Sequence, residues 1–447
     1  MGMKTSKKQV AINPLKVSQA LGGVLAFQGF FRSMPIIHGS QGCAAFIKAL
    51  MTRHFREPIA LQTSALQEMN VIFGSEQCMS EALDNVIARH DPAIIGVFST
   101  ALTETAGEDL KRNTAAYLQS RSSSKFIIPV SLPDFTGSLE SGYRITVEAI
   151  VHEAVGRMAG KLPARKVKHR VNLLAGSHLT PSDVMELKQI LQAFDLEVVT
   201  VPDISTSLVA PRVKGFSSLT RGGVSLAELC TMMLTAEITI AVGASMEGAA
   251  KILHEYRGIP YCLFKSVTGL EASDELFSFL QNYTGEQVPM KFRWERDNLL
   301  DCMLDAHFYF SGRKVAVASE PDHLHAIIQL IKELGGGFSG LVTSISTPLV
   351  TETAEKIVAG DLDDLENMAA GADLWLSNSH GRQGASRLRV PFLPIGFPVF
   401  DQLGSLLTTS IGYRGTTELL IKIANALIDG AHARNKHFVE SLRITGL

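Results

Sequence analysis

Cysteine is scarce in this sequence, and its few copies lie far apart. The chain has 447 residues and five cysteines, and no two of them form a CxxC pair. Zinc and iron–sulfur sites that one chain completes alone usually take several ligands from a short segment. No such self-contained site is therefore expected among Cys43, Cys78, Cys230, Cys262 and Cys302.

Export and membrane signals are also lacking. The N-terminus has no apolar stretch typical of a signal peptide, and no apolar run approaches the ~18–20 residues that span a bilayer. We therefore expect a cytoplasmic protein with no membrane contact, in a reducing compartment where a disulfide framework is not expected. The net charge of −2 does not suggest nucleic-acid binding, for which a basic face would be expected.

Common nucleotide and metal motifs are absent or misplaced. The sequence contains no Walker A loop and no HExxH. Residues 335–340 match GxGxxG by letters, but they follow a predicted helix and precede a predicted strand. A dinucleotide-binding unit has the opposite order, so we interpret these glycines as the end of a helix.

Hydrophobic residues, at 46% of the chain, form short strand-like runs that alternate with amphipathic helices. One unit, for example, has a predicted helix near 104–118 between two strands. This alternation is typical of parallel sheets covered by helices. We predict the α/β class, with three Rossmann-like domains of parallel β-sheets flanked by helices. Polar breaks near 161–170 and 293–301 give domains 1–165, 166–298 and 299–447.

The most distinctive polar segment is the loop His38-Gly39-Ser40-Gln41-Gly42-Cys43. An apolar helix face follows it, so Cys43 should lie at or near a helix N-terminus, where the dipole and the free N–H groups favour a thiolate. Gly39 and Gly42 would allow the backbone to bend tightly and to approach whatever Cys43 holds.

From the residues alone, three interpretations of Cys43 remain open. It could be a small core residue, a ligand of a metal cluster at an interface, or a nucleophilic or redox group with His38 as base. No second cysteine is placed to resolve an oxidised thiol, which weakens the redox interpretation. The other four cysteines are interpreted as core or incidental residues.

Six segments, in order along the chain, resemble the β-type chains of the nitrogenase component 1 superfamily. Ordered matches over nearly the whole chain are far more specific than one short motif. The resemblance implies a nitrogenase component 1-like fold. The segments are Asn13–Lys16, His38–Cys43, Arg53–Ile59, Pro133–Ser138, Ser377–Arg382 and Gly396–Asp401.

The departures from that pattern are as informative as the matches. Catalytic β-chains of the superfamily carry three cysteines that help to hold the P-cluster, and Cys43 corresponds to the first. Leu61 and Ala101 stand where the other two would fall, and Asp134 aligns with a serine that can also touch that cluster. The chain therefore resembles the β-type chains of the scaffold that matures the nitrogenase iron–molybdenum cofactor.

That resemblance implies a set of partners and cofactors. The β-type chain would pair with NifE in an α2β2 heterotetramer, with a [4Fe–4S] cluster at each interface held by three cysteines of NifE and by Cys43. Gly39 and Gly42 would contribute the backbone beside the cluster. The complex would take an iron–molybdenum cofactor precursor from NifB, act with the nitrogenase iron protein, and pass the matured cofactor to apo-nitrogenase. Such a chain is a scaffold rather than a self-standing enzyme, although its superfamily is one of oxidoreductases.

Three alternatives remain beside the scaffold hypothesis. The first is a catalytic nitrogenase β-subunit, which the absence of two cysteines disfavours. The second is a subunit of a related two-component reductase, although Arg53–Ile59 and Gly396–Asp401 fit the scaffold chains better. The third is a metal-free α/β protein in which Cys43 is a nucleophile.

Overall fold

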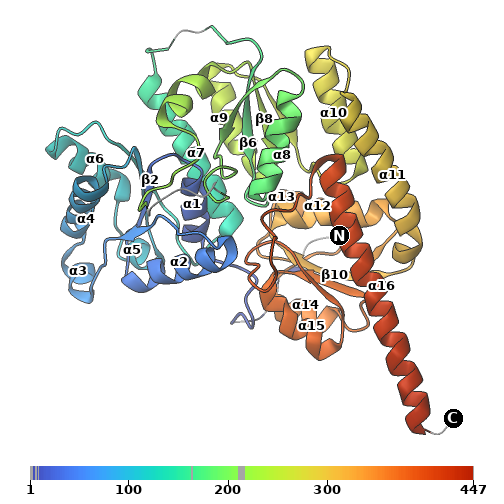
Figure 1. The fold of residues 1–447 in the computed structure, drawn as a ribbon. Coiled ribbons are helices and arrows are strands. Elements are labelled where there is room, and N and C mark those ends of the chain that lie inside the picture. Colours follow the sequence, from blue (N-terminus) through green and yellow to red (C-terminus); the bar gives the residue numbers. More distant parts are fainter. Residues whose placement is uncertain (1–3, 6–7, 9, 163–164, 210–216, 446–447) are drawn as a thin grey trace. The chain divides into compact units, whose positions relative to one another are not determined.

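The computed structural model describes residues 4–5, 8, 10–162, 165–209 and 217–445. The chain forms two compact units, Met1–Lys16 with Ser266–Leu447, and Val17–Lys265. They contain three sheets, and every strand pairing among the described residues is parallel. The predicted α/β class, with three parallel sheets flanked by helices, is confirmed (Figure 1). The three domain ranges stay a prediction, and residues 163–164 of the break near 161–170 lie outside the described residues.

The first sheet of the Val17–Lys265 unit has the strand order β3-β2-β4-β5. Helices α4 and α6 share a core with one face of this sheet, and Tyr117 of α6 donates to Asp84 of α4 at 2.8 Å. On α1, the ring of Phe27 meets that of Phe98 in β4 edge to face at 5.3 Å. The elements are α1 (Gln19–Gln28), β2 (Ser33–Ile37), α2 (Gln41–Phe55), β3 (Gln62–Thr63), α3 (Glu68–Phe73), α4 (Glu76–His90), β4 (Ile94–Phe98), α5 (Ala101–Thr105), α6 (Leu110–Ser120), β5 (Phe126–Val130) and α7 (Leu139–Met158).

Helices α1 and α7 meet at glycines. A Cβ on Gly22 would lie 2.0 Å from the carbonyl oxygen of Leu139, and a Cβ on Gly142 would lie 2.0 Å from that of Gln19. Only glycine lets the two backbones come this close. Helix α7 also reaches the next sheet, since the hydroxyl of Tyr143 donates to the carbonyl of the last residue of β6 at 3.0 Å.

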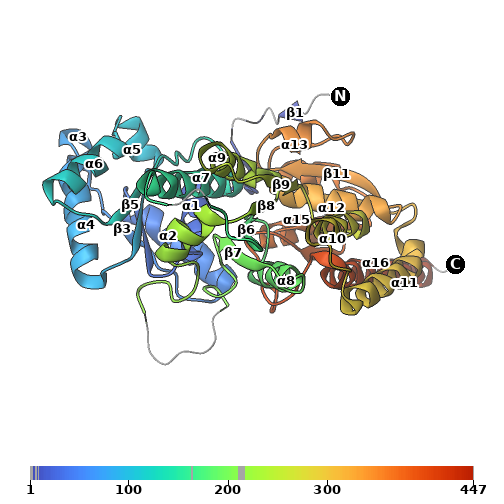
Figure 2. The same ribbon diagram turned by 90° about the horizontal axis from the view of Figure 1, so that it is seen from above.

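The second sheet of this unit has the order β7-β6-β8-β9. Its helix α8 starts with a capping box, in which the Thr180 hydroxyl accepts from the backbone N–H of Asp183. The elements are β6 (Arg170–Ala175), α8 (Pro181–Gln192), β7 (Glu197–Val201), β8 (Ile238–Val242), α9 (Glu247–Arg257) and β9 (Tyr261–Phe264), with short helical turns at Glu228–Met232, Met233–Thr235 and Ala244–Met246. Figure 2 shows this unit and the other from above.

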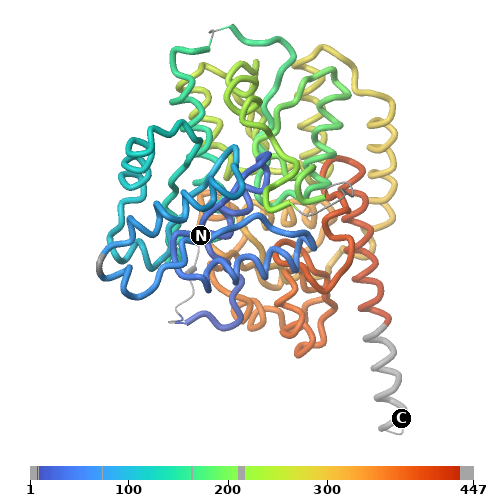
Figure 3. Tube along the Cα trace, turned by 60° about the vertical axis from the view of Figure 1, so that its left-hand side comes forward, coloured from blue at the N-terminus to red at the C-terminus, as the bar shows by residue number. Residues whose placement is uncertain are grey.

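The other unit has one sheet of order β1-β12-β11-β10-β13-β14. Successive side chains of β10 point to opposite faces of this sheet. Val315 and Val317 join the core with α12 and α16, while Ala316 and Ala318 join the core with α14 and α15. Figure 3 traces the chain through these elements. They are β1 (Lys4–Thr5), α10 (Leu270–Thr284), α11 (Met290–Phe310), β10 (Lys314–Ser319), α12 (Pro321–Glu333), β11 (Gly337–Thr343), α13 (Pro348–Thr351), β12 (Val358–Ala359), α14 (Leu362–Met368), β13 (Leu374–Ser377), a turn at Ser379–Gly381, α15 (Arg382–Leu388), β14 (Phe392–Pro394) and α16 (Gly412–Thr445).

Two local expectations need correction. The helix expected near 104–118 is two helices, α5 and α6, because the chain turns between them at Gly107, whose φ is +74°. The glycines after α12 do end that helix, but Gly337 already belongs to β11. Among the described residues, no helix combines the length and apolar character needed to cross a bilayer.

Candidate metal-ligand site at Cys43

Cys43 lies where the sequence placed it, in the first turn of α2. Strand β2 ends at Ile37, and Ser40 is the N-cap of the helix. The thiol is half-buried, and its sulfur lies 3.5 Å from the Ser40 hydroxyl oxygen. The structure therefore leaves part of the Cys43 residue at the surface.

The two glycines of the loop have different roles. A Cβ on Gly39 would lie 2.6 Å from the Cγ2 of Thr100, so a side chain at this position would collide with the start of α5. At Gly42, the nearest atom to such a Cβ is the Ser40 hydroxyl oxygen, at 3.9 Å. Gly39 is thus required by the packing of the chain itself. The exposed Gly42 leaves room directly beside the Cys43 turn, as close approach by a bound group would need.

His38 is fully buried and has partners at both ring nitrogens. Its Nδ1 lies 2.9 Å from the Ser64 hydroxyl, and its Nε2 lies 2.9 Å from the Ser75 hydroxyl and 2.7 Å from Oε2 of Glu108. Neither nitrogen faces Cys43. This geometry argues against His38 as the base of a Cys43 nucleophile, because a catalytic base must reach the proton that it removes.

Glu108 is the charged member of this cluster. Burial raises the pKa of its carboxyl, but hydrogen bonds from His38 and Ser75 outweigh burial and hold the pKa below the usual range. An ionised carboxylate can only accept hydrogen bonds, so it takes one from the His38 ring and one from Ser75. Sequence reasoning did not find Glu108 and Ser75. Glu108 lies 33 residues from Ser75 and 70 residues from His38 along the chain, and no short-range pattern links residues that far apart.

Leu61, Ala101 and Asp134, which stand where catalytic β-chains have further cluster ligands, border strands of the same sheet as Cys43. Leu61 is buried directly before β3, Ala101 is the first residue of α5 after β4, and Asp134 lies in the loop after β5. Asp134 accepts a hydrogen bond from Ser18 at 2.5 Å. In a parallel sheet the carboxyl ends of the strands lie at one side, so Ala101 and Asp134 lie at the side where Cys43 begins α2, whereas Leu61 precedes its own two-residue strand.

The thiols of this chain do not form a metal site by themselves. Among the described residues, no group of three or more His, Cys, Asp or Glu side chains is arranged to hold a metal ion. Cys78, Cys230, Cys262 and Cys302 are half-buried and outside disulfides, and they lie on α4, the 228–232 turn, β9 and α11. A cluster held at Cys43 would therefore need its other ligands from beyond the described residues of this chain.

Apolar side chains at this edge are exposed on the elements next to Cys43. Phe46 of α2 is 70% exposed and Phe135, in the loop after β5, is 62% exposed. Leu102 of α5 is also exposed.

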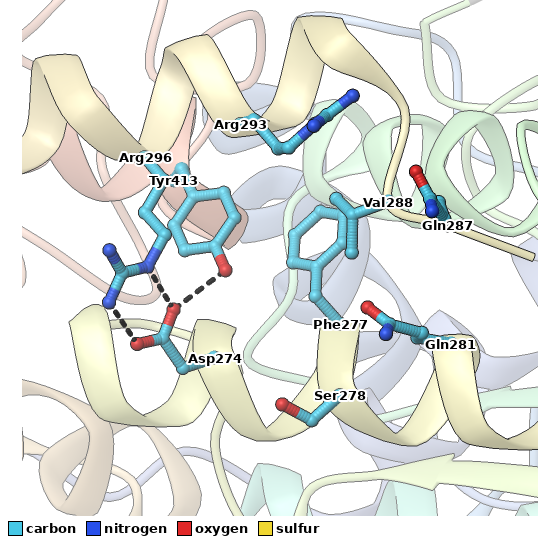
Figure 4. A pocket seen from close by; sticks show the side chains of 9 residues that line it. All are labelled: Asp274, Phe277, Ser278, Gln281, Gln287, Val288, Arg293, Arg296 and Tyr413. Carbon is cyan, nitrogen blue, oxygen red and sulfur yellow. Dashed lines mark hydrogen bonds and ion pairs between the residues drawn. The ribbon is translucent and has the colours of Figure 1, made fainter.

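A separate pocket lies in the other unit, among α10, α11 and the start of α16. It has a volume of about 470 Å³, and its polar wall is Asp274, which Figure 4 shows between Arg296 and Tyr413. Arg296 binds both carboxylate oxygens at 2.8 Å, and the Tyr413 hydroxyl donates to one of them at 2.7 Å. The ring of Tyr413 also stacks on that of Phe277. These contacts join the three helices, and we assign them a structural role.

This carboxylate gives a pH dependence with a definite sign. Burial raises the pKa of Asp274, but hydrogen bonds from Arg296 and Tyr413 outweigh burial and leave the pKa below its usual value. The stabilisation is therefore complete above the unfolded-state pKa of about 4 and is lost as the pH falls through the folded-state pKa. We expect the urea midpoint of this unit to drop less steeply below about pH 4 in Asp274→Asn than in wild type. Equal slopes would refute this role.

Comparisons with known proteins agree with the fold. The family described as "Nitrogenase component 1 type Oxidoreductase" matches residues 18–428. The chain is 39% identical to a protein of Rippkaea orientalis and 40% identical to one of Nostoc sp., both named "Nitrogenase iron-molybdenum cofactor biosynthesis protein NifN", and each alignment covers 98% of both chains. A structure entitled "Nitrogenase Cp1 at pH 6.5" matches with a TM-score of 0.88 and 29% identity, over 95% of each chain. The predicted resemblance is confirmed, and the chain belongs to the nitrogenase component 1 type oxidoreductase family.

Proposed function

We propose that this chain is a scaffold subunit for assembly of the nitrogenase iron–molybdenum cofactor. The relatives that match nearly its whole length are named for biosynthesis of that cofactor. Within its own sequence, Leu61 and Ala101 have no sulfur to offer a large cluster. A catalytic β-subunit would need ligands at those places, so the scaffold role fits this chain better.

The proposed complex is an α2β2 heterotetramer with NifE. At each interface, Cys43 gives one ligand to a [4Fe–4S] cluster, and cysteines of NifE give the other three. One observation carries this assignment: Cys43 is a half-buried thiol in the first turn of α2, beside the open side of Gly42 and exposed apolar side chains. When bound, such a cluster carries single electrons at a potential that its surroundings set.

A second surface supports an assembly of more than two chains. Met290, Trp294, Leu304 and Phe308 are exposed, and their spacing places them on one face of α11. The opposite side of this helix contributes Phe310 and other residues to the core of its unit. An assembly of several chains offers such an apolar face a partner, because large apolar groups gathered at one surface mark contact sites for other proteins.

The proposed part of the chain in maturation rests on its likeness to cofactor-biosynthesis proteins. NifB would supply the iron–sulfur precursor, the nitrogenase iron protein would act on the complex, and apo-nitrogenase would receive the matured cofactor. This chain would supply one side of the cluster site and part of the surface that these proteins meet. The precursor site would lie mainly in NifE, so few of the residues that hold the precursor would belong to this chain, which would carry out no turnover without a partner.

Purification with and without NifE tests this proposal. The chain should be isolated anaerobically in both forms, and iron content and the spin signal of a [4Fe–4S] cluster should be measured. We expect the cluster in the complex and little iron in the chain alone, because one thiol cannot hold four irons. A stable iron-free chain with its own catalytic turnover would overturn the scaffold role, as would a full cluster in the chain without NifE.

A further inference from the structure

His38 joins four segments of the chain that are far apart in sequence. It belongs to the loop after β2, and its ring contacts Ser64 after β3, Ser75 at the start of α4, and Glu108 in the turn between α5 and α6. Ser75 also donates to Glu108. His38 and Ser75 are buried, Ser64 is half-buried, and 12% of the Glu108 side chain is exposed.

One arrangement of protons satisfies every member of this network. The ionised Glu108 accepts from Nε2–H of His38 and from the Ser75 hydroxyl. Nδ1 then accepts from the Ser64 hydroxyl, whose oxygen accepts the backbone N–H of Gly39 at 3.2 Å. We assign the tautomer from these partners. The hydrogen bonds thus run without a break from Glu108 to the backbone of the residue that precedes the N-cap of α2.

The backbone of the same loop is held from both sides. The carbonyl of Gly39 accepts from the N–H of Leu66 at 2.9 Å and from the Thr63 hydroxyl at 3.2 Å. The carbonyl of His38 accepts from the hydroxyls of Thr100 and Thr103, each at 3.4 Å. Together these contacts fix the position from which α2, and with it Cys43, departs.

We propose that Glu108, acting through His38, is a positioning residue that fixes the Cys43 loop before any cluster or partner chain is bound. The inference rests on the proposed role of Cys43 as a ligand. It goes further in stating that the geometry of the ligand is built by the chain's own hydrogen bonds. A metal site formed on such a preorganised loop needs little rearrangement when its other half arrives.

Removal of the carboxylate has a defined consequence. In Glu108→Ala, the Ser75 hydroxyl loses its acceptor and Nε2–H of His38 keeps only the Ser75 oxygen at 2.9 Å, and a buried donor without a partner is costly. The loop can regain partners for them by opening to water, which exposes Cys43. Glu108→Gln keeps one carbonyl oxygen for His38 but cannot accept both hydrogen bonds equally well, so it should open the loop less.

The test measures alkylation of Cys43 in the full-length, metal-free chain. Peptide mass spectrometry gives the rate for each thiol, so Cys230, Cys262 and Cys302 report global opening in the same sample. Cys78 is left out because the pKa of that thiol is raised by burial and then by the charges of Glu81 and Glu108, so removing Glu108 would change its reactivity directly. We expect Glu108→Ala to speed alkylation of Cys43 by about tenfold, with the three reference thiols unchanged, and Glu108→Gln to give an intermediate rate.

Glu104→Gln is the matched control, since it removes the same charge four residues earlier, where the carboxylate accepts from Ser131 and does not contact His38. Its Cys43 rate should equal that of wild type. An unchanged Cys43 rate in Glu108→Ala overturns the inference, and so does an equal rise at all four thiols, which would mean general unfolding.

A second measurement uses the complex with NifE. There, Glu108→Ala should change the line shape of the cluster's spin signal, and Glu104→Gln should leave it as in wild type. An identical line shape in all three proteins would contradict positioning of the ligand. Failure of the proposed function looks different: Cys43→Ala would then leave the cluster intact, while the alkylation rates of the metal-free chain would still report on the loop.

Discussion

In the complex with NifE, Cys43→Ala is expected to remove the spin signal of the interfacial cluster and most of its iron. The substitution deletes the one thiol that this chain offers at that edge, and a [4Fe–4S] cluster bound by three thiolates lacks a ligand at one iron. The methyl group fits the site because Cys43 is half-buried and its sulfur contacts only the Ser40 hydroxyl among the hydrogen-bond partners described. Folding should therefore be unaffected.

Cys78→Ala is the control within the same unit. Cys78 is also half-buried, but it lies on α4, away from the first turn of α2. Iron content and spin signal should match those of wild type. If Cys43→Ala keeps an unchanged cluster, or if both variants lose it equally, Cys43 is not the ligand.

The second large effect concerns the contact between α1 and α7. Gly142→Ala should destabilise the Val17–Lys265 unit by about 3 kcal/mol, the upper end for overpacked cores. The added Cβ would lie 2.0 Å from the carbonyl oxygen of Gln19. No rotamer change can relieve a clash between a Cβ and a backbone atom, so the helices must separate and loosen the core around Phe27.

Gly156→Ala, on the same helix, is expected to have the opposite effect on stability. Nothing lies within 4 Å of a Cβ at this position, and alanine is favoured over glycine in a helix by up to ~1 kcal/mol. Urea titration followed by hydrogen exchange of α7 peptides should show lower stability for Gly142→Ala and equal or higher stability for Gly156→Ala. Similar shifts of the same sign in both variants would contradict the close helix contact.

The parts of the fold that sequence predicted are those with a strong period. The helix expected before the glycines of 335–340 appears as α12, whose apolar residues recur at spacings of three to four, and the strand expected after them appears as β11. Strands β1, β3 and β12 have two residues each, too few for any period, and they were not predicted. The break between α5 and α6 was missed because Gly107 interrupts a pattern that otherwise continues as a helix.

The candidate site was predicted only in part, because only part of it depends on a local sequence pattern. Cys43 precedes an apolar helix face, so its place at a helix N-terminus follows from local pattern. The partnership of His38 with Glu108 joins positions 70 residues apart, and only the folded sheet brings them together. The sequence shows only that both loop positions are glycine. It could not distinguish Gly39, which packs against Thr100, from Gly42, which faces open space.

Isotope labelling tests the central claim most directly. Cysteine labelled with 13C at Cβ is incorporated only into this chain, the complex is formed with unlabelled NifE, and electron–nuclear double resonance is recorded on the reduced cluster. The account predicts a 13C coupling from a single cysteine of this chain, which disappears in Cys43→Ala together with the native signal and persists in Cys78→Ala. A native cluster signal without any 13C coupling would show that all its thiolates come from NifE, and it would contradict the assignment of Cys43.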